Sequence, residues 1–265
     1  MKRKIGDFIR KFNTLDTEII KVPFFEDETS IRIVQLSDLH IPRNAFMVTE
    51  IAKVVKDLKP DLIFITGDMM DGKWSFNGAK LSLITKLLVK IGPVYVVSGN
   101  HERRHKKYYQ IWETMMKLLG TKYLKNEISY ITFSGKRIGL IGLKDMTTKD
   151  ALDEDFSFLT KMERNLDLVL MLTHRPNEWR KFYPEKGPLP DFVFSGHAHG
   201  GQVGIPLLNR GLIGPNKKIL PKFVNGLYKY EDGSCEIISR GLACATRPVR
   251  INNRPHIPVL DITKK

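Results

Sequence analysis

Residues 31–40, with the sequence Ile-Arg-Ile-Val-Gln-Leu-Ser-Asp-Leu-His, decide the fold and the place of the site. The first six form a short, mostly apolar run, typical of a buried strand, and Asp38 and His40 follow it directly. Four later runs have the same form, at 62–66, 94–97, 168–172 and 192–194. Because a parallel strand buried on both faces has a continuous apolar sequence, we predict a layered α/β domain.

Each of these runs is followed by side chains that bind metal ions. They are Asp38, His40, Asp68, Asn100, His174, His197 and His199. Open sheets place their sites beyond the carboxyl ends of the strands, so we expect these side chains to meet at one edge. Carboxylate, amide and imidazole groups suit hard or borderline divalent ions, and two neighbouring ions need ligands from several elements and a bridging carboxylate. The sequence therefore predicts a site for two divalent metal ions.

The spacing within the clusters predicts their local geometry. In 38–40 and 197–199 the two ligands stand two residues apart, which directs both side chains to the same side of an extended backbone. Gly67, Gly99 and Gly196 permit sharp departures from the strand ends and close approach to the ions.

The composition is that of one globular domain. Of the 265 residues, 42% are hydrophobic and 27% charged, which argues against disorder, and no apolar run is long enough to span a membrane or to form a secretory signal. Cys235 and Cys244 are expected to be reduced thiols in a cytoplasmic protein. We expect residues 18–265 to form one domain, preceded by a basic amphipathic segment at 1–17.

The charge of the chain is strongly positive. There are 43 Lys and Arg residues against 29 Asp and Glu, a net charge of +14, which favours anionic partners or surfaces. Ile5, Phe8, Ile9 and Phe12 have helical spacing among basic residues. This segment either lies on an anionic membrane or packs on the domain itself. No nucleic-acid-binding module is recognisable, so specific nucleic-acid binding is not expected.

The remaining patterns predict alternating helices and strands. Helices are expected at 48–58, 81–90, 108–119 and 153–164, and further strands at 19–24, within 123–143, at 227–230 and at 235–239. Residues 202–225 read as a long loop rich in Gly, Pro and Lys. Its leucines and isoleucine, at 207, 208, 212 and 213, either hold an acyl chain or close a small core beneath the loop.

Taken in order, the clusters resemble a known family. Asp38-Leu-His40, Gly67-Asp68, Gly99-Asn-His101, the lone His174 and Gly196-His-Ala-His199 match the D-x-H, G-D, G-N-H, H and G-H-x-H blocks of the calcineurin-like metallophosphoesterases. The resemblance extends over about 31–262, and residues 196–202 are similar to a membrane-associated bacterial branch. It implies a four-layer α/β/β/α sandwich of two mixed sheets, the metallo-dependent phosphatase fold.

The resemblance also implies a role for each site residue. Asp38, His40, Asp68 and His199 would hold one metal ion, and Asp68, Asn100, His174 and His197 the other, with Asp68 as the bridge. His101 would contact the phosphate and protonate the leaving oxygen. A hydroxide bridging the ions would attack phosphorus, without a phosphoenzyme. Mn²⁺ is the favoured ion, with Fe²⁺ or Zn²⁺ as alternatives.

The substrate is the least constrained prediction. We expect hydrolysis of a phosphodiester or pyrophosphate bond in a lipid-linked substrate, by an enzyme peripheral to the inner face of the membrane. The alternatives are a soluble nucleotide phosphodiesterase, a phosphatase, or a catalytically silent binding protein, which is disfavoured because no ligand is missing. Asp71 is expected either to form a turn or to support the metal ligands. His105, His256, Arg103 and Arg104 are expected to lie on the solvated surface, the two arginines within reach of a substrate phosphate.

Overall fold

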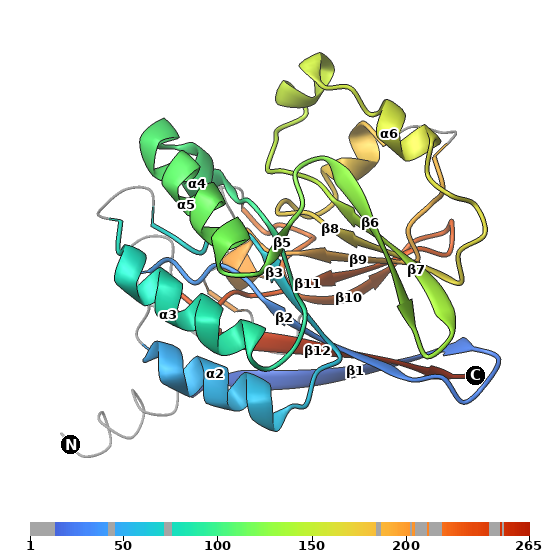
Figure 1. Cartoon of the computed structure of the whole chain (residues 1–265), viewed down its shortest axis with the longest axis horizontal. Helices are drawn as coiled ribbons and strands as arrows, with labels where there is room; N and C mark the ends of the chain where they lie inside the picture. The colour runs from blue at the N-terminus through green and yellow to red at the C-terminus, as the bar shows by residue number, and fades with distance from the viewer. Residues whose placement is uncertain are drawn as a thin grey trace.

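A computed structural model describes residues 14–41, 46–71, 76–183, 187–201, 203–204, 211, 219–243, 250 and 252–265 (Figure 1). The strands are β1 (Asp16–Phe25), β2 (Ile31–Leu36), β3 (Leu62–Thr66), β4 (Val94–Val97), β5 (Lys122–Tyr123), β6 (Glu127–Phe133), β7 (Lys136–Gly142), β8 (Leu168–Leu172), β9 (Phe192–Ser195), β10 (Gly226–Lys229), β11 (Cys235–Ile238) and β12 (His256–Lys264). The helices are α2 (Val48–Asp57), α3 (Gly78–Val89), α4 (Asn100–Arg103), α5 (Lys106–Leu118) and α6 (Ser157–Thr160), with 3-10 helices η1 (Asp150–Asp153), η2 (Trp179–Lys181) and η3 (His199–Gly201).

Within these residues the strands form two six-stranded sheets. The first has the order β1-β12-β2-β3-β4-β5 and the second the order β10-β11-β9-β8-β7-β6. Strands β2 to β5 are parallel to one another, as are β7, β8, β9 and β11. The β12–β2, β6–β7 and β10–β11 pairs are antiparallel, so both sheets are mixed. The predicted pair of mixed sheets is confirmed.

Apolar side chains pack the sheets face to face. Ile33 and Phe64 of the first sheet share one buried cluster with Leu170 and Phe194 of the second, and the rings of Phe64 and Phe194 meet edge to face at 4.9 Å. These strands are apolar on both faces because each sheet is also covered on its outer side. The inter-sheet core therefore fixes how the edges of the two sheets meet.

Helices form the two outer layers. Helices α2, α3 and α5 cover the first sheet, where Ile51, Leu81 and Trp112 pack against its strands, and α6 lies on the far side of the second sheet (Figure 1). Leu159 of α6 and Trp179 of η2 pack against that second sheet. The α/β/β/α order is confirmed, with a thinner helical layer over the second sheet.

Two predicted elements differ from the structure. The helix expected at 153–164 is broken into η1 and the one-turn α6, because the Asp155 side chain accepts a hydrogen bond from the Ser157 backbone N–H at 2.7 Å and so favours a local turn. Strand β12 was not predicted. Its Pro258 argues against a strand in the middle of a sheet, but β2 pairs only from Val259 onward, so proline interrupts no bond to β2.

Several predictions fall outside the described residues. These are the amphipathic pattern between 5 and 12, the apolar residues at 207, 208, 212 and 213, and Cys244. Cys235 is a buried free thiol. Among the residues that the structure describes, no helix is long and apolar enough to cross a bilayer.

Candidate metal centre

The ligand-bearing segments leave the carboxyl ends of β2, β3, β4, β8 and β9, where the edges of the two sheets come together. Backbone hydrogen bonds join neighbouring segments within each sheet, from Asp38 N–H to the Gly67 carbonyl at 3.0 Å and from Gly196 N–H to the His174 carbonyl at 3.0 Å. The Gln35 amide donates to Thr66 Oγ1 within the first sheet at 2.9 Å and to the Ser195 carbonyl of the second sheet at 2.8 Å. Side chains far apart in the sequence are thus held against one another.

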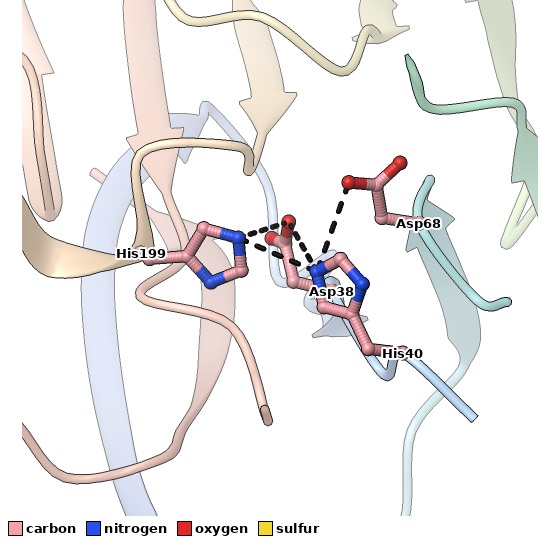
Figure 2. Close-up of side chains that lie close together, drawn as sticks. All are labelled: Asp38, His40, Asp68 and His199. Atoms are coloured by element: carbon pink, nitrogen blue, oxygen red, sulfur yellow. Dashed lines mark hydrogen bonds and ion pairs between the residues drawn. The ribbon is translucent and has the colours of Figure 1, made fainter. Parts of the chain in front are cut away.

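Four of these side chains form a first cluster: Asp38, His40, Asp68 and His199, all buried. Each offers one ligand atom, and the four atoms lie within 4.8 Å of one another (Figure 2). Asp38 Oδ1 is 3.3 Å from His199 Nε2, and His40 Nε2 is 3.4 Å from His199 Nε2 and 3.8 Å from Asp68 Oδ2. This is a compact set of oxygen and nitrogen donors.

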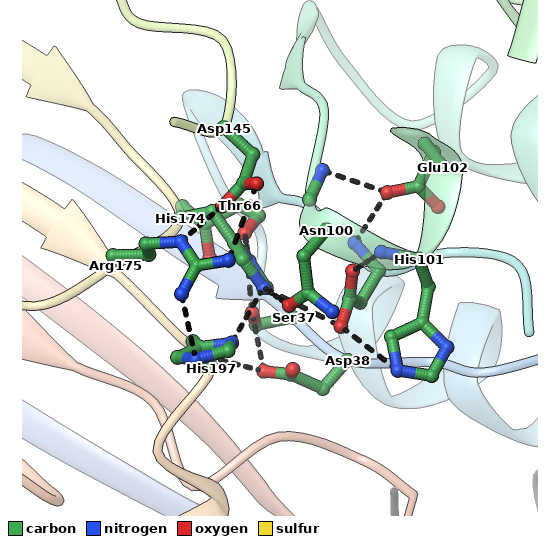
Figure 3. Close-up of polar contacts among 12 residues, drawn as sticks. Ser37, Asp38, Thr66, Asn100, His101, Glu102, Asp145, His174, Arg175 and His197 are labelled. Carbon is green, nitrogen blue, oxygen red and sulfur yellow. Dashed lines mark hydrogen bonds and ion pairs between the residues drawn. The ribbon is translucent and has the colours of Figure 1, made fainter. Parts of the chain in front are cut away.

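A second cluster gathers Asp68 with Asn100, His174 and His197. Figure 3 shows Asn100, His174 and His197 side by side in this cluster. His174 Nε2 lies at its centre, 3.4 Å from Asp68 Oδ2, 3.1 Å from Asn100 Oδ1 and 3.2 Å from His197 Nδ1. Asp68, His174 and His197 each offer one ligand atom, and these three atoms also lie within 4.8 Å of one another. Asp68 Oδ2 belongs to both clusters, while its Oδ1 accepts the His101 backbone N–H at 2.8 Å.

In His174 and His199 the nitrogen that faces away from the clusters contacts a backbone carbonyl, and the other nitrogen faces into the cluster. His174 Nδ1 lies 2.7 Å from the Thr66 carbonyl, and His199 Nδ1 lies 3.1 Å from the Ala243 carbonyl. A carbonyl oxygen only accepts, so each Nδ1 carries a hydrogen and each Nε2 of a neutral ring presents a lone pair. Asp38 Oδ1 is buried and accepts no hydrogen bond from any described residue, yet it faces the His199 lone pair. Facing acceptors of this kind fit a cation placed between them.

The electrostatics of the clusters also favour positive charge. Burial raises the pKa of Asp68, but the imidazoles of His174, His40 and His101 outweigh it and hold this pKa well below its usual value. Burial lowers the pKa of His174, but Asp68, Asp38 and Asp145 together raise it to about 10, so a cation binds Nε2 by displacing the proton that these carboxylates attract. Burial, followed by the charges of His174 and Arg175, holds the pKa of His197 well below its usual value. Ionised carboxylates and an unprotonated His197 are the states in which these groups bind a metal ion.

Glycines at the strand ends leave room for the carboxylates. A Cβ on Gly99 would lie 2.2 Å from Asp68 Oδ1, and one on Gly196 would lie 1.9 Å from Ser37 Oγ and 2.6 Å from Asp38 Oδ2. A Cβ at either position would displace a cluster carboxylate.

The predicted extended backbone of the two-residue ligand pairs is wrong. Asp38, His40, His197 and His199 have φ values of 53°, 44°, 64° and 47°, in the left-handed region. The φ of Asp68, 54°, lies in the same region. Non-glycine residues held there cost about 1–3 kcal/mol each and concentrate at functional sites. His197 and His199 contribute to different clusters, whereas Asp38 and His40 contribute to the same one.

His101 lies beside the clusters rather than in their centres. Its ring meets that of His40 edge to face at 4.5 Å, its Nε2 is 3.9 Å from Asp68 Oδ2, and its Nδ1 is 3.4 Å from Asp71 Oδ1. Burial lowers the pKa of His101, although Asp68 opposes the effect. Asp71 is buried at the end of the same loop as Asp68, as expected for a supporting residue.

The sequence analysis missed two supporting groups. Glu102 is buried and accepts the backbone N–H groups of Asp68, Met70 and Gly99 at 2.7–2.9 Å, which ties the β3 loop to the β4 loop. Its place directly after Gly99-Asn-His101 was an available signal. Asp145 and Arg175 form an ion pair of 2.7 Å beside His197, and the irregular segment that carries Asp145 gave no signal.

The surface prediction for His256 is wrong. The residue is buried at the start of β12, and its Nε2 lies 3.0 Å from Glu18 Oε2 on β1. Arg103 is partly exposed but engaged, since its Nη1 reaches the Asp145 carbonyl and lies 3.4 Å from Asp150 Oδ2. His105 and Arg104 are exposed as predicted.

Comparison with known proteins gives a consistent picture. The family model described as calcineurin-like phosphoesterase matches residues 31–201. The chain is 30% identical to an uncharacterized metallophosphoesterase, YkoQ of Bacillus subtilis, over 86% of this chain and 82% of that protein. It is 27% identical to the phosphodiesterase YaeI of Escherichia coli, over 91% of this chain and 86% of that protein.

Solved structures share the fold at low sequence identity. The NAD nucleotidase of Haemophilus influenzae superposes with a TM-score of 0.52 at 15% identity, over 82% of this chain and 46% of that one. GAP50, the inner-membrane-complex anchor of Plasmodium, superposes with a TM-score of 0.50 at 12% identity, over 88% and 81% of the two chains.

Proposed function

The chain belongs to the calcineurin-like phosphoesterase family and is a metal-dependent phosphoester hydrolase, and we propose that it cleaves a phosphodiester or pyrophosphate bond at a dinuclear centre. The observation that carries this proposal is the sharing of Asp68 Oδ2 between two clusters of metal-binding atoms. One ion would take Asp38, His40, Asp68 and His199, and the other Asp68, Asn100, His174 and His197. Two divalent ions held there would lower the pKa of a bound water, which supplies hydroxide as the nucleophile, and would neutralise charge on the phosphoryl oxygens.

The chain's own residues complete the chemistry. His101 stands beside Asp68 and His40, at the rim of the space that both clusters face. An imidazole placed there donates a proton to the departing oxygen or holds a phosphoryl oxygen during the displacement. The proposed nucleophile is a hydroxide that the two ions would activate, so a covalent phosphoenzyme is not part of the proposal.

Hydrolysis of model substrates tests the proposed chemistry. Protein stripped with a chelator is assayed with bis(p-nitrophenyl) phosphate and with p-nitrophenyl phosphate, without metal and after addition of Mn²⁺, Fe²⁺ or Zn²⁺. We expect metal-dependent cleavage of the diester, fastest with Mn²⁺, because oxygen and nitrogen ligands without thiolate suit that ion. Cleavage of the monoester alone would redirect the proposal to a phosphatase. Absence of cleavage of both substrates with any metal would contradict phosphoester hydrolysis and favour the catalytically silent binding protein.

We further propose a lipid-linked substrate and peripheral contact with an anionic membrane on its inner face. The net charge of +14 and the basic amphipathic pattern of residues 1–17 support this contact. A relative of 24% identity from Bos taurus carries the name "transmembrane protein with metallophosphoesterase domain", and the chain covers 56% of it. Cosedimentation with vesicles of phosphatidylglycerol and phosphatidylcholine tests the contact. Deletion of residues 1–13 should abolish the cosedimentation, whereas full binding by the truncated chain would contradict this role.

A further inference from the structure

Arg175 lies beside the second cluster in a fixed orientation. Its Nε donates to Asp145 Oδ1 at 2.7 Å, its Nη2 is 3.4 Å from Asp145 Oδ2, and its Nη1 is 3.3 Å from His197 Nε2 (Figure 3). Asp145 is itself buried, and Arg103 donates to its backbone carbonyl. Asp145 therefore holds the guanidinium through Nε and Nη2, and the remaining nitrogen, Nη1, is directed at the second cluster.

The contact between Arg175 and His197 does not persist as a hydrogen bond once His197 Nδ1 binds an ion. Nδ1 is the atom that faces His174 Nε2 in the second cluster, and as a metal ligand it uses its lone pair. The hydrogen of the neutral ring then sits on Nε2. A guanidinium nitrogen only donates, so Nη1 faces a second donor. In the metal-loaded protein, Nη1 needs an acceptor from elsewhere.

The position of Nη1 limits what that acceptor can be. It lies at the rim of the second cluster, where the Arg175 side chain is 16% exposed and a ligand can reach it. A simple phosphodiester carries a single negative charge, which the two divalent ions would already neutralise. A substrate with a second phosphate group offers further anionic oxygens next to the scissile phosphorus, and arginine binds such oxygens well.

We propose that Arg175 forms a subsite for a second phosphate group, so that pyrophosphate-containing substrates are preferred over simple diesters. This inference rests on the proposed function and narrows its substrate class. Arg103, which also contacts Asp145, supports the subsite by holding Asp145 in place.

Binding of a matched ligand pair tests the subsite without relying on turnover. AMP and the non-hydrolysable α,β-methylene-ADP differ by one phosphate group, and both are titrated by calorimetry into Mn²⁺-loaded protein at constant free Mn²⁺. We expect Arg175→Gln to weaken α,β-methylene-ADP about 10- to 100-fold and AMP by less than about threefold, since hydrogen bonds to charged groups are worth more than neutral ones. Arg175→Lys should restore part of the loss. Arg137→Gln, which alters an exposed arginine at the start of β7, is the control.

The metal content of each variant separates this role from a structural one. Two bound ions in Arg175→Gln, measured by mass spectrometry, together with selective loss of the diphosphate, support the subsite. Equal weakening of both ligands, no weakening, or loss of about one ion per chain would overturn it. Failure of the proposed function is seen separately, as wild-type protein that does not cleave bis(p-nitrophenyl) phosphate with any metal.

Discussion

The two ligand clusters share one carboxylate but differ in how open they are. In the first cluster every side chain is buried, and the Ala243 carbonyl fixes His199 from behind. In the second cluster Asn100 and His197 are partly exposed, and Arg175 stands at the rim. Burial slows ligand exchange and openness admits substrate, so we expect the first cluster to hold its ion tightly and the second to exchange its ion more readily. Single substitutions in and around the clusters test this difference.

Asp68→Asn should have the largest effect because it removes charge from both clusters at once. An amide oxygen is neutral and bridges two cations poorly. We expect loss of both ions and a fall in turnover of more than about 10³-fold, beyond the effect of losing one electrostatic contact in a site. Mass spectrometry of bound metal and the bis(p-nitrophenyl) phosphate assay measure the two effects. Asp57→Asn, on the exposed face of α2, is the control, and an active metal-free Asp68→Asn protein would refute the bridge.

His101→Ala should spare the metals and impair the reaction. His101 lies outside the centres of both clusters, so two ions should remain bound. A lost proton donor typically lowers turnover about 10²- to 10⁴-fold. His105→Ala, which changes an exposed histidine four residues along the chain, should leave turnover unchanged. Loss of metal from His101→Ala would instead place this residue among the ligands.

His197→Ala and His199→Ala compare the clusters directly. We expect His197→Ala to lose the more exchangeable ion, and His199→Ala to lose the more tightly held one. In a graded chelator titration followed by metal analysis, the wild-type chain should release its ions in two steps. The first step should be missing in His197→Ala and the second in His199→Ala. A single shared step in the wild-type protein would show that the difference in burial does not set affinity.

Glu102→Gln should loosen the loops that carry both clusters. The carboxylate accepts three backbone N–H groups, and the amide replaces one acceptor oxygen with a donor that faces them. A buried donor left unsatisfied costs about 1–3 kcal/mol, which should appear in the free energy of unfolding of the metal-free protein. Glu127→Gln, at the exposed start of β6, should change this free energy little. Equal stabilities would show that the loops hold without Glu102.

The smallest effect concerns His256, which belongs to neither cluster. Burial lowers the pKa of His256, with Glu18 opposing, so the folded state favours the neutral ring. The neutral His256 ring therefore contributes fully to the stability of the folded state above the ordinary histidine pKa, about 6.5. This contribution is lost as the pH falls from there through the lowered pKa of His256 in the folded protein. Chemical denaturation between pH 7 and 5 should show a steeper loss for wild type than for His256→Gln. Parallel curves would contradict the assignment.

The sequence predicted the sheets and the ligand residues because both depend on local signals. A continuous apolar run marks a buried strand, and the residue type after it marks the chemistry. The left-handed backbone of Asp38 and His197 was not predictable, because it depends on partners from other loops rather than on spacing. Asp145 and His256 were missed or misplaced for the same reason, since Arg175, Arg103 and Glu18 reach them from distant segments. Local pattern carries no information on such pairs.

The place of β12 has a consequence for biosynthesis. It lies between β1 and β2, pairing Val259 with Val34, so β2 gains its neighbour on that side only from a segment made far later. On the ribosome, the strand that carries Asp38 and His40 waits with an unpaired edge until residues 256–264 emerge. Such delayed, non-local pairing makes folding slow and leaves an exposed edge that other chains can join. We therefore expect the nascent chain to need chaperone protection until residues 256–264 have left the ribosome.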